Sequence, residues 1–194
     1  MSSAGPVPGS PPPVIKLTPT SYLVLGMVRL GIGYGYAIKK VADQSTQNFW
    51  PTSLAQVYPE LARLEEAELL SRRSNPRGER ARSAYAITER GEEALRNWLR
   101  SPIPTRPQMR DPGLLRLFFA DALDGEDQLE LVRRLRQRNH DLVQELRTEI
   151  LPRAEALESG GIHYLAISAR FLADFLGFAE DWTARLEAEL EAAH

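Results

Sequence analysis

The sequence predicts a mainly helical protein with two domains and a single two-stranded hairpin. Three observations lead to this fold class. Proline-rich stretches at residues 2–13 and 101–107 interrupt an otherwise amphipathic chain of 194 residues. Between them, four segments with helical periodicity accompany one short pair of strand-like segments. After the second stretch, only helical periodicity remains.

The composition excludes several classes of protein. With 43% hydrophobic and 26% charged residues, the chain is in the range of soluble globular proteins. It has no cysteine, and its three histidines lack ligand spacing, so we expect no metal site, no disulfide and no thiol chemistry. No apolar run approaches the ~20 residues of a membrane span, and the start has no secretory pattern. We therefore expect a cytoplasmic protein that is not an enzyme and that needs no cofactor.

The two proline-rich stretches set the expected domain boundaries. Residues 1–16 are rich in Gly, Ser and Pro and are expected to form a disordered arm. Residues 101–110 hold the second proline cluster and are expected to form a linker. The predicted domains are therefore residues 17–100 and residues 111–194.

The first domain is predicted to begin with three helices. Thr18 supplies a good N-cap for the first helix, and a second helix covers residues 36–44. The third helix opens at Ser53, whose spacing to Gln56 is that of a capping box.

A hairpin and a fourth helix complete the first domain. Strand-like segments at residues 69–74 and 82–87 flank a turn at residues 75–78, and Thr88 then caps a helix over residues 89–100. This order of elements is that of a winged helix-turn-helix. In that fold the third helix can enter the major groove of DNA while the hairpin, or wing, reaches a neighbouring backbone or groove.

Candidate DNA-binding residues lie at the start of the third helix and on the wing. The residues expected at the groove are Thr52, Ser53, Gln56 and Tyr58. Of these, Gln56 has the chemistry to read adenine or to bond a phosphate. The wing has five arginines against one acid and is expected to bind phosphates; the arginines are Arg72, Arg73, Arg77, Arg80 and Arg82. Two alternatives remain: a generally arginine-rich composition, and a winged domain that binds protein instead of DNA.

The distribution of charge along the chain indicates that the two domains have different functions. The chain as a whole has a net charge of −2. Residues 14–100 contain 13 Lys and Arg against 9 Asp and Glu, whereas residues 101–194 contain 11 against 17. A basic part is therefore joined to an acidic part, which favours double-stranded DNA as a partner of the first part only.

The second domain is predicted to be all helical. A short helix starts at Asp111, a long helix runs from about Glu126 toward Glu158, and a last helix covers residues 162–193. The long helix has an apolar seam formed by Val132, Leu135, Asn139, Leu142, Leu146 and Ile150. Within this seam, Asn139 either fixes the register of the helices or faces outward.

The last helix has two apolar stripes, one of leucines and one of aromatic residues, roughly 90° apart. A domain of three helices offers few neighbours that cover both stripes, so we expect a homodimer. The expected interface residues are Leu172, Phe175, Leu176, Trp182 and Leu186.

The aromatic residues of the second domain also predict an effector pocket at the domain junction, for a small, flat aromatic molecule. The residues expected to line it are Phe118, Phe119, Tyr164, Phe171 and Phe178. The alternative is a filled core without a cavity.

Three segments in the first domain resemble those of the PadR-like transcriptional regulators. Residues 35–38 resemble the entry of the second helix in that family, residues 53–65 its recognition helix, and residues 85–91 its second wing strand and following helix. The resemblance extends over about residues 17–190. The acidic domain is similar to the dimerisation domain found in part of the family. Together with the winged fold, the resemblance favours a homodimeric repressor that binds a pseudo-palindromic operator and is controlled by a small effector or by a partner.

The chain departs from the family pattern at two places. Glu68 stands where the family usually has glycine, so we expect a strained turn or a different end of the recognition helix. Ala55 and Gln56 replace a common Gly-Thr pair, which points to a different base preference.

Overall fold

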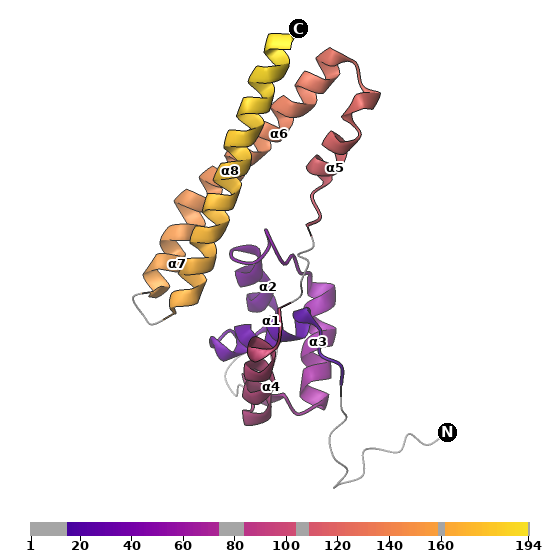
Figure 1. Ribbon diagram of the computed structural model, residues 1–194. Coiled ribbons are helices and arrows are strands. Elements are labelled where there is room, and N and C mark those ends of the chain that lie inside the picture. The colour runs from indigo at the N-terminus through magenta and orange to yellow at the C-terminus, as the bar shows by residue number, and fades with distance from the viewer. Residues whose placement is uncertain (1–14, 74–83, 104–108, 159–161, 194) are drawn as a thin grey trace, which may run out of the picture. The chain divides into compact units, whose positions relative to one another are not determined.

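The computed structural model describes residues 15–73, 84–103, 109–158 and 162–193. It divides into two compact units, Met1–Pro104 and Thr105–His194 (Figure 1). The predicted arm lies outside the described residues up to residue 14. Ile15 already packs against the core of the first unit, so the packed part of this unit begins before residue 17.

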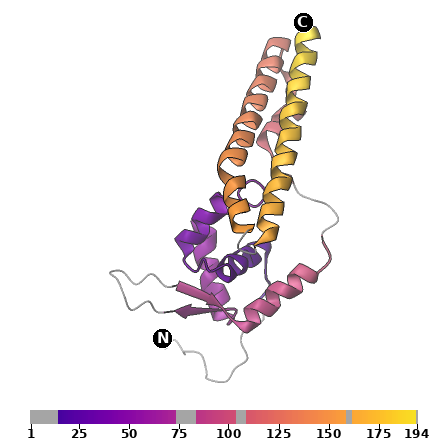
Figure 2. The same cartoon turned by 90° about the vertical axis from the view of Figure 1, so that its left-hand side faces the viewer.

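The first unit has the winged helix-turn-helix arrangement, which confirms the predicted fold class. Its elements are α1 (Pro19–Arg29), α2 (Gly35–Asp43), α3 (Leu54–Glu66), β1 (Leu70–Arg73), β2 (Ala84–Ile87) and α4 (Glu89–Arg100). The two strands are antiparallel, with Leu70 opposite Ile87 and Arg72 opposite Tyr85, and they appear as the pair of arrows in Figure 2.

Local capping chemistry fixes where these helices begin. The hydroxyl of Thr18 accepts the Ser21 amide at 3.3 Å, and the Ser21 hydroxyl accepts the Thr18 amide at 2.8 Å. The Thr88 hydroxyl likewise accepts the Gly91 amide at 3.0 Å at the start of α4. Each cap satisfies backbone donors that the first turn of a helix leaves unpaired.

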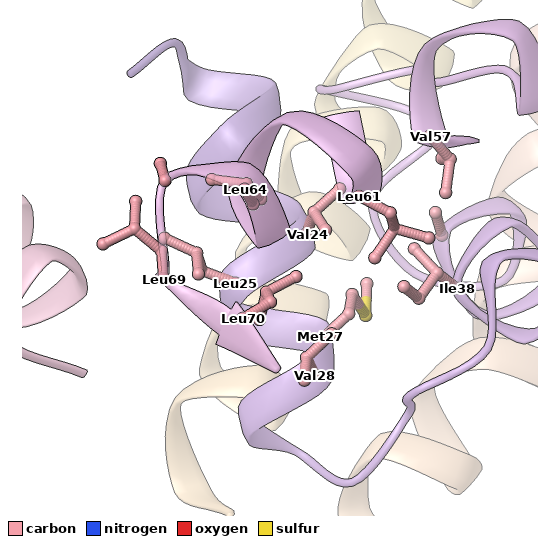
Figure 3. Close-up of a cluster of buried hydrophobic side chains, with 12 residues drawn as sticks. Val24, Leu25, Met27, Val28, Ile38, Val57, Leu61, Leu64, Leu69 and Leu70 are labelled. Atoms are coloured by element: carbon pink, nitrogen blue, oxygen red, sulfur yellow. The ribbon is translucent and has the colours of Figure 1, made fainter. Parts of the chain in front are cut away.

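The core of the first unit joins all three helices of the helix-turn-helix (Figure 3). Leu61 and Leu64 of α3 are fully buried, as are Val24 and Leu25 of α1 and Ile38 of α2. Burial of each such side chain contributes about 1.5–3 kcal/mol of hydrophobic stabilisation. This packing sets the orientation of α3 and so decides which of its sides faces outward.

Glu68 keeps the turn that glycine usually makes at the end of the recognition helix. Its φ is +58°, in the left-handed region. The Leu69 amide donates to the Leu64 carbonyl at 2.9 Å, and the Glu68 amide donates to the Glu65 carbonyl at 2.9 Å. These two bonds form a Schellman motif. The predicted strain is therefore present in the left-handed residue, at a cost of about 1 to 3 kcal/mol, while the helix end keeps its geometry.

Two glycines of the motif segments stand where chain segments approach closely. A Cβ on Gly35 would lie 2.7 Å from the ring of Tyr58, and a Cβ on Gly91 would lie 2.2 Å from the carbonyl oxygen of Leu69. The absence of a side chain at Gly35 thus lets the ring of Tyr58 pack against the start of α2. Gly91 lets α4 pack directly against the segment that enters β1.

The second unit is all helical, as predicted. Its elements are α5 (Pro112–Phe118), a short 3-10 turn (Ala120–Ala122), α6 (Gly125–Glu145), a π-turn (Leu146–Ile150), α7 (Leu151–Glu158) and α8 (His163–Ala193). Both views show α6 and α7 running side by side with α8 (Figures 1 and 2). Within the described ranges, no helix has the length and apolar character needed to cross a membrane.

The π-turn separates the predicted long helix into two parts. It ends two residues before Pro152, whose missing amide and bulky ring disfavour a regular α-helical turn in the residues that precede it. Val143, rather than the predicted Leu142, is the fully buried residue of the seam, and Leu142 is half-buried. Between Asn139 and Leu146, the buried position of the seam is therefore residue 143 and not residue 142 as predicted.

Asn139 is buried and joins a polar chain that connects three helices. Its side-chain amide donates to the Ala179 carbonyl at 3.2 Å and to the Thr183 hydroxyl at 3.4 Å, and its carbonyl accepts from Arg138. Arg138 in turn binds both carboxylate oxygens of Asp111, the N-cap of α5, at 2.6 and 2.9 Å. These bonds hold the pKa of Asp111 below its usual value. Of the two alternatives for Asn139, the structure shows the inward-facing one.

Candidate nucleic-acid interface

The outward side of α3 displays three of the four residues expected at the groove. Ser53, Gln56 and Tyr58 are exposed, and the Tyr58 side chain retains 53% of its accessible surface. Thr52 differs, because its hydroxyl oxygen is buried and has no partner among the described residues. The Thr52 hydroxyl is therefore not exposed at this surface.

Gln56 is engaged in the cap of its own helix. Its side-chain carbonyl oxygen accepts the Ser53 amide at 3.0 Å and the Ser53 hydroxyl at 3.2 Å. Because that oxygen has two lone pairs, the cap uses its accepting capacity. The amide group of the side chain still has its donors, which suit a phosphate oxygen or a purine N7.

Arg63 is the one cation of α3, and it faces the packed side of the unit. Its guanidinium binds Glu60 at 2.7 Å, the Ser21 hydroxyl at 2.9 Å and the Lys16 carbonyl at 2.9 Å. The hydrogen bond with Glu60 raises the pKa of Arg63. Arg63 therefore holds α3 against α1 and the segment before it.

On the wing, Arg72 is bound to the recognition helix. Its guanidinium makes two hydrogen bonds to the Glu65 carboxylate, at 3.0 and 2.7 Å, and a third to the Tyr85 hydroxyl at 3.2 Å. The hydrogen bonds that Arg72 donates to Glu65 are the main reason that the pKa of Arg72 is raised. The pair is solvent-exposed, so it orients Arg72 and contributes little to stability.

The remaining wing arginines divide between described and undescribed residues. Arg73 is exposed at the end of β1. Arg77, Arg80 and Arg82 lie outside the described residues, and their assignment to DNA binding stays a prediction. Arg73 thus provides an exposed cation at the root of the wing, next to the Arg72–Glu65 pair.

The root of the wing is joined to the turn between α1 and α2. The Tyr85 amide donates to the Gly33 carbonyl at 2.8 Å, and a Cβ on Gly33 would lie 2.4 Å from the Tyr85 carbonyl oxygen. At the other end of β2, the Thr88 hydroxyl donates to the carbonyls of Glu68 and Leu69 at 2.8 and 3.1 Å. The wing root is therefore fixed to the helical part of the unit.

The residues expected at the dimer interface fall into two groups. Leu172 is buried within its own unit, where it packs with Leu146, Ile150 and Ala173, and Leu176 borders the same cluster. Leu186 is half-buried. Phe175 and Trp182 are exposed. The leucine stripe of α8 is thus largely covered by the same chain.

The aromatic residues predicted for an effector pocket are exposed in the single chain. They are Phe118, Phe119, Tyr164, Phe171 and Phe178. Phe118 and Phe119 meet edge to face at 5.0 Å, and Phe171 stacks on Phe175 with ring centres 6.4 Å apart. The aromatic residues of α8 form an outward-facing stripe that contains Tyr164, Phe171, Phe175, Phe178 and Trp182 and that we call the aromatic stripe.

Sequence reasoning missed two residues of this interface. Glu65, which holds Arg72, lies near the end of α3, whereas Arg72 follows seven residues later in β1, so no spacing rule within one helix connects them. Gly33 lies in the turn between α1 and α2. Its close approach to Tyr85 arises from the tertiary fold, and the only sequence signal was the glycine itself.

The first domain is similar in sequence to a family of transcriptional regulators. Residues 24–97 match the family model described as the transcriptional regulator PadR-like family. A curated relative, the negative transcriptional regulator PadR of Bacillus subtilis (strain 168), is 27% identical over 111 residues, or 57% of this chain. The match spans 61% of that relative's length. The family and this relative are transcriptional regulators and not enzymes.

Solved structures share the fold over most of the chain. The PadR-like transcriptional regulator BC1756 from Bacillus cereus aligns with a TM-score of 0.75 and 21% identity, over 90% of this chain and 99% of that chain. Bacillus subtilis PadR in complex with operator DNA aligns with a TM-score of 0.74 and 21% identity, over 88% and 98%. The same protein in complex with p-coumaric acid aligns with a TM-score of 0.70 and 19% identity, over 91% and 99%.

Proposed function

Because residues 24–97 belong to the PadR-like family of transcriptional regulators, we propose that this chain is a homodimeric, sequence-specific DNA-binding repressor. The observation that carries the proposal is the arrangement of the first unit. There, an exposed α3 and an arginine-bearing wing root are fixed to one core.

The proposed mechanism is steric. The N-terminal half of α3 enters the major groove, where Ser53, Gln56 and Tyr58 meet the DNA, and the wing arginines bind the flanking phosphates. Two such units grip the halves of a pseudo-palindromic operator and block polymerase. The similarity to a curated negative regulator supports repression over activation.

Dimerisation is proposed to use the second unit. The leucine stripe of α8 is largely covered by α6, the π-turn and α7 of the same chain, whereas the aromatic stripe is exposed. A contiguous exposed row of large aromatic side chains is unusual for a monomer and is typical of an interaction surface. A second copy that offers the same stripe can cover it across a two-fold axis.

The competing proposal is a winged module that binds protein and not DNA. The wing arginines distinguish the two, because phosphate contacts make affinity fall steeply with salt. The first experiment selects fragments of the organism's own genomic DNA with the full chain. It then measures affinity for the selected fragments as a function of salt concentration.

Replacing two wing arginines, Arg73→Ala with Arg77→Ala, should weaken binding to every DNA sequence. Each lost phosphate contact reduces the slope of log affinity against log salt by about 0.9, so the double variant should have a slope lower by nearly two. The matched control is Arg134→Ala with Arg153→Ala in the second unit, where each arginine forms a surface pair with the glutamate four residues before it. If wing and control variants retain the same slope, the assignment of the wing is wrong.

Replacing Glu65 by glutamine should strengthen DNA binding. The carboxylate holds Arg72 in an exposed ion pair, so its removal should free the guanidinium for a phosphate, raise affinity about twofold to fivefold and steepen the salt slope by about 0.9. Fluorescence anisotropy with a labelled operator measures both quantities. Glu66→Gln removes a charge from the next residue and keeps the Arg72 pair; an equal gain in that variant would point to charge alone.

We further propose an aromatic effector, supported by a structural neighbour that was solved in complex with p-coumaric acid. An effector can release DNA only by binding the released geometry more tightly than the bound one. A variant with Trp50 and Trp98 replaced by phenylalanine leaves Trp182 as the reporter. Aromatic acids should change both its emission and the operator affinity. A ligand panel that changes neither would contradict the effector proposal.

A further inference from the structure

The outward side of α3 is apolar where the N-terminal part of a recognition helix meets bases. Leu54, Ala55, Tyr58 and Ala62 fall within an arc of about 100° around the helix axis, and all four are exposed. Leu54 retains 38% of its accessible surface although it is a leucine. Neither Leu54 nor Tyr58 belongs to the hydrophobic core cluster of the first unit.

This side also lacks the side chains that most often read guanine. Arginine and lysine are the usual partners of guanine O6 and N7. The whole of α3 is described, and its one cation, Arg63, is bound to Glu60, Ser21 and the Lys16 carbonyl. A guanine-specific contact from α3 would therefore have to break the bonds that hold the helix against α1.

Gln56 is also poorly placed for the bidentate contact that identifies adenine. That contact needs the side-chain oxygen to accept a hydrogen bond from adenine N6 while the nitrogen donates to N7. The oxygen already accepts two hydrogen bonds from Ser53. The free donors of Gln56 cannot distinguish adenine from guanine, because both present N7 in the major groove.

The base feature that matches this surface is the C5-methyl group of thymine, the only methyl group that unmodified DNA presents in the major groove. We propose that α3 recognises its operator mainly through thymine methyl groups, which pack against Leu54, Ala55 and the ring of Tyr58. This inference rests on the proposed DNA-binding function and names the bases that are read.

The position of Tyr58 supports this assignment. Its ring lies against Gly35 at the start of α2, where a Cβ would approach within 2.7 Å. A ring that is held in this way presents a fixed apolar surface at little cost in conformational entropy. Leu54 stands one helical turn before Tyr58 on the same side of α3, so the two can border neighbouring base pairs.

Substitution of thymine by uracil tests the proposal, because uracil lacks only the methyl group. The full chain is titrated with its genomically selected operator, and with duplexes in which each thymine of a half-site is replaced in turn. We expect a loss of about threefold to fourfold for each contacted methyl, the value for burying one such group. Uracil placed outside the half-sites should have no effect.

A variant links the methyl group to the protein. Leu54→Ala should lower the affinity of the protein for the operator that carries thymine. The same substitution should lower its affinity less for the duplex that carries uracil at the contacted position. The matched control is Leu99→Ala, an exposed leucine of α4, which should leave the difference between thymine and uracil unchanged.

The outcomes separate the inference from the proposed function. If genomic fragments are selected but uracil has no effect at any position, thymine recognition is wrong while DNA binding stands. If the half-sites contain only G·C pairs, the inference is also wrong. If the chain selects no DNA at all, both the function and the inference are overturned.

Discussion

Replacing Phe171 and Phe178 together by glutamate should convert the protein into a monomer and lower its operator affinity by about 100-fold or more. These two side chains retain 70% and 62% of their accessible surface, so the substitution disturbs the packing of their own unit little. In the proposed dimer the same positions are buried. Four added charges would then face one another across the two-fold axis without partners.

The loss of affinity follows from the loss of the second half-site. In a dimer, binding of one unit raises the effective concentration of the other at its half-site. Sedimentation velocity measures the oligomeric state, and fluorescence anisotropy measures the affinity. Phe171→Leu with Phe178→Leu is the matched control and should remain dimeric. A glutamate variant that still sediments as a dimer would place the interface elsewhere.

Gly91→Ala should destabilise the first unit by about 2 to 3 kcal/mol. The new methyl group would lie 2.2 Å from the Leu69 carbonyl oxygen and 2.9 Å from a side-chain carbon of Ile87. Because the nearest atom belongs to the backbone, relief requires α4 to move away from the wing root. For a unit of this size, the Tm should fall by about 10 to 20 °C.

The matched control for this prediction is Gly26→Ala in α1. Space around Gly26 is open, with no heavy atom within 4 Å of an added Cβ. An alanine inside a helix is favoured over glycine by about 1 kcal/mol, so this variant should have a slightly raised Tm. Thermal unfolding followed by circular dichroism measures both variants. Equal Tm values for the two would show that the close approach at Gly91 relaxes without cost.

The elements of both units could be predicted from the sequence because their ends are set by neighbours in the chain. Thr18, Thr88 and Asp111 cap helices by accepting amides within three residues, and such bonds depend on spacing alone. The same locality explains why α4 begins and ends at the predicted residues. The Schellman turn at Glu68 follows a local pattern too, although the side chain there does not favour it.

The features that were not predicted from the sequence depend on contacts between segments that are distant along the chain. The predicted seam placed Leu142 inside, but Val143 is the fully buried residue, because the way α6 packs in the second unit decides which side is covered. The pairing of Arg72 with Glu65 depends on how tightly the chain turns between α3 and β1. Hydrophobic periodicity predicts neither the burial of Val143 nor the Arg72–Glu65 pair, because it describes positions along one element and not the elements that pack against it.

The hydrogen bond between the Tyr85 amide and the Gly33 carbonyl has a consequence for the lifetime of a protein–DNA complex. A wing that is hinged at its root can leave the DNA while the recognition helix stays bound. Dissociation then passes through partly bound intermediates that rebind rapidly. Here the root is bound to the turn between α1 and α2, and Thr88 binds it to the end of α3. The wing root and recognition helix should therefore leave a half-site together, so that dissociation of each half-site is one kinetic step with one activation barrier.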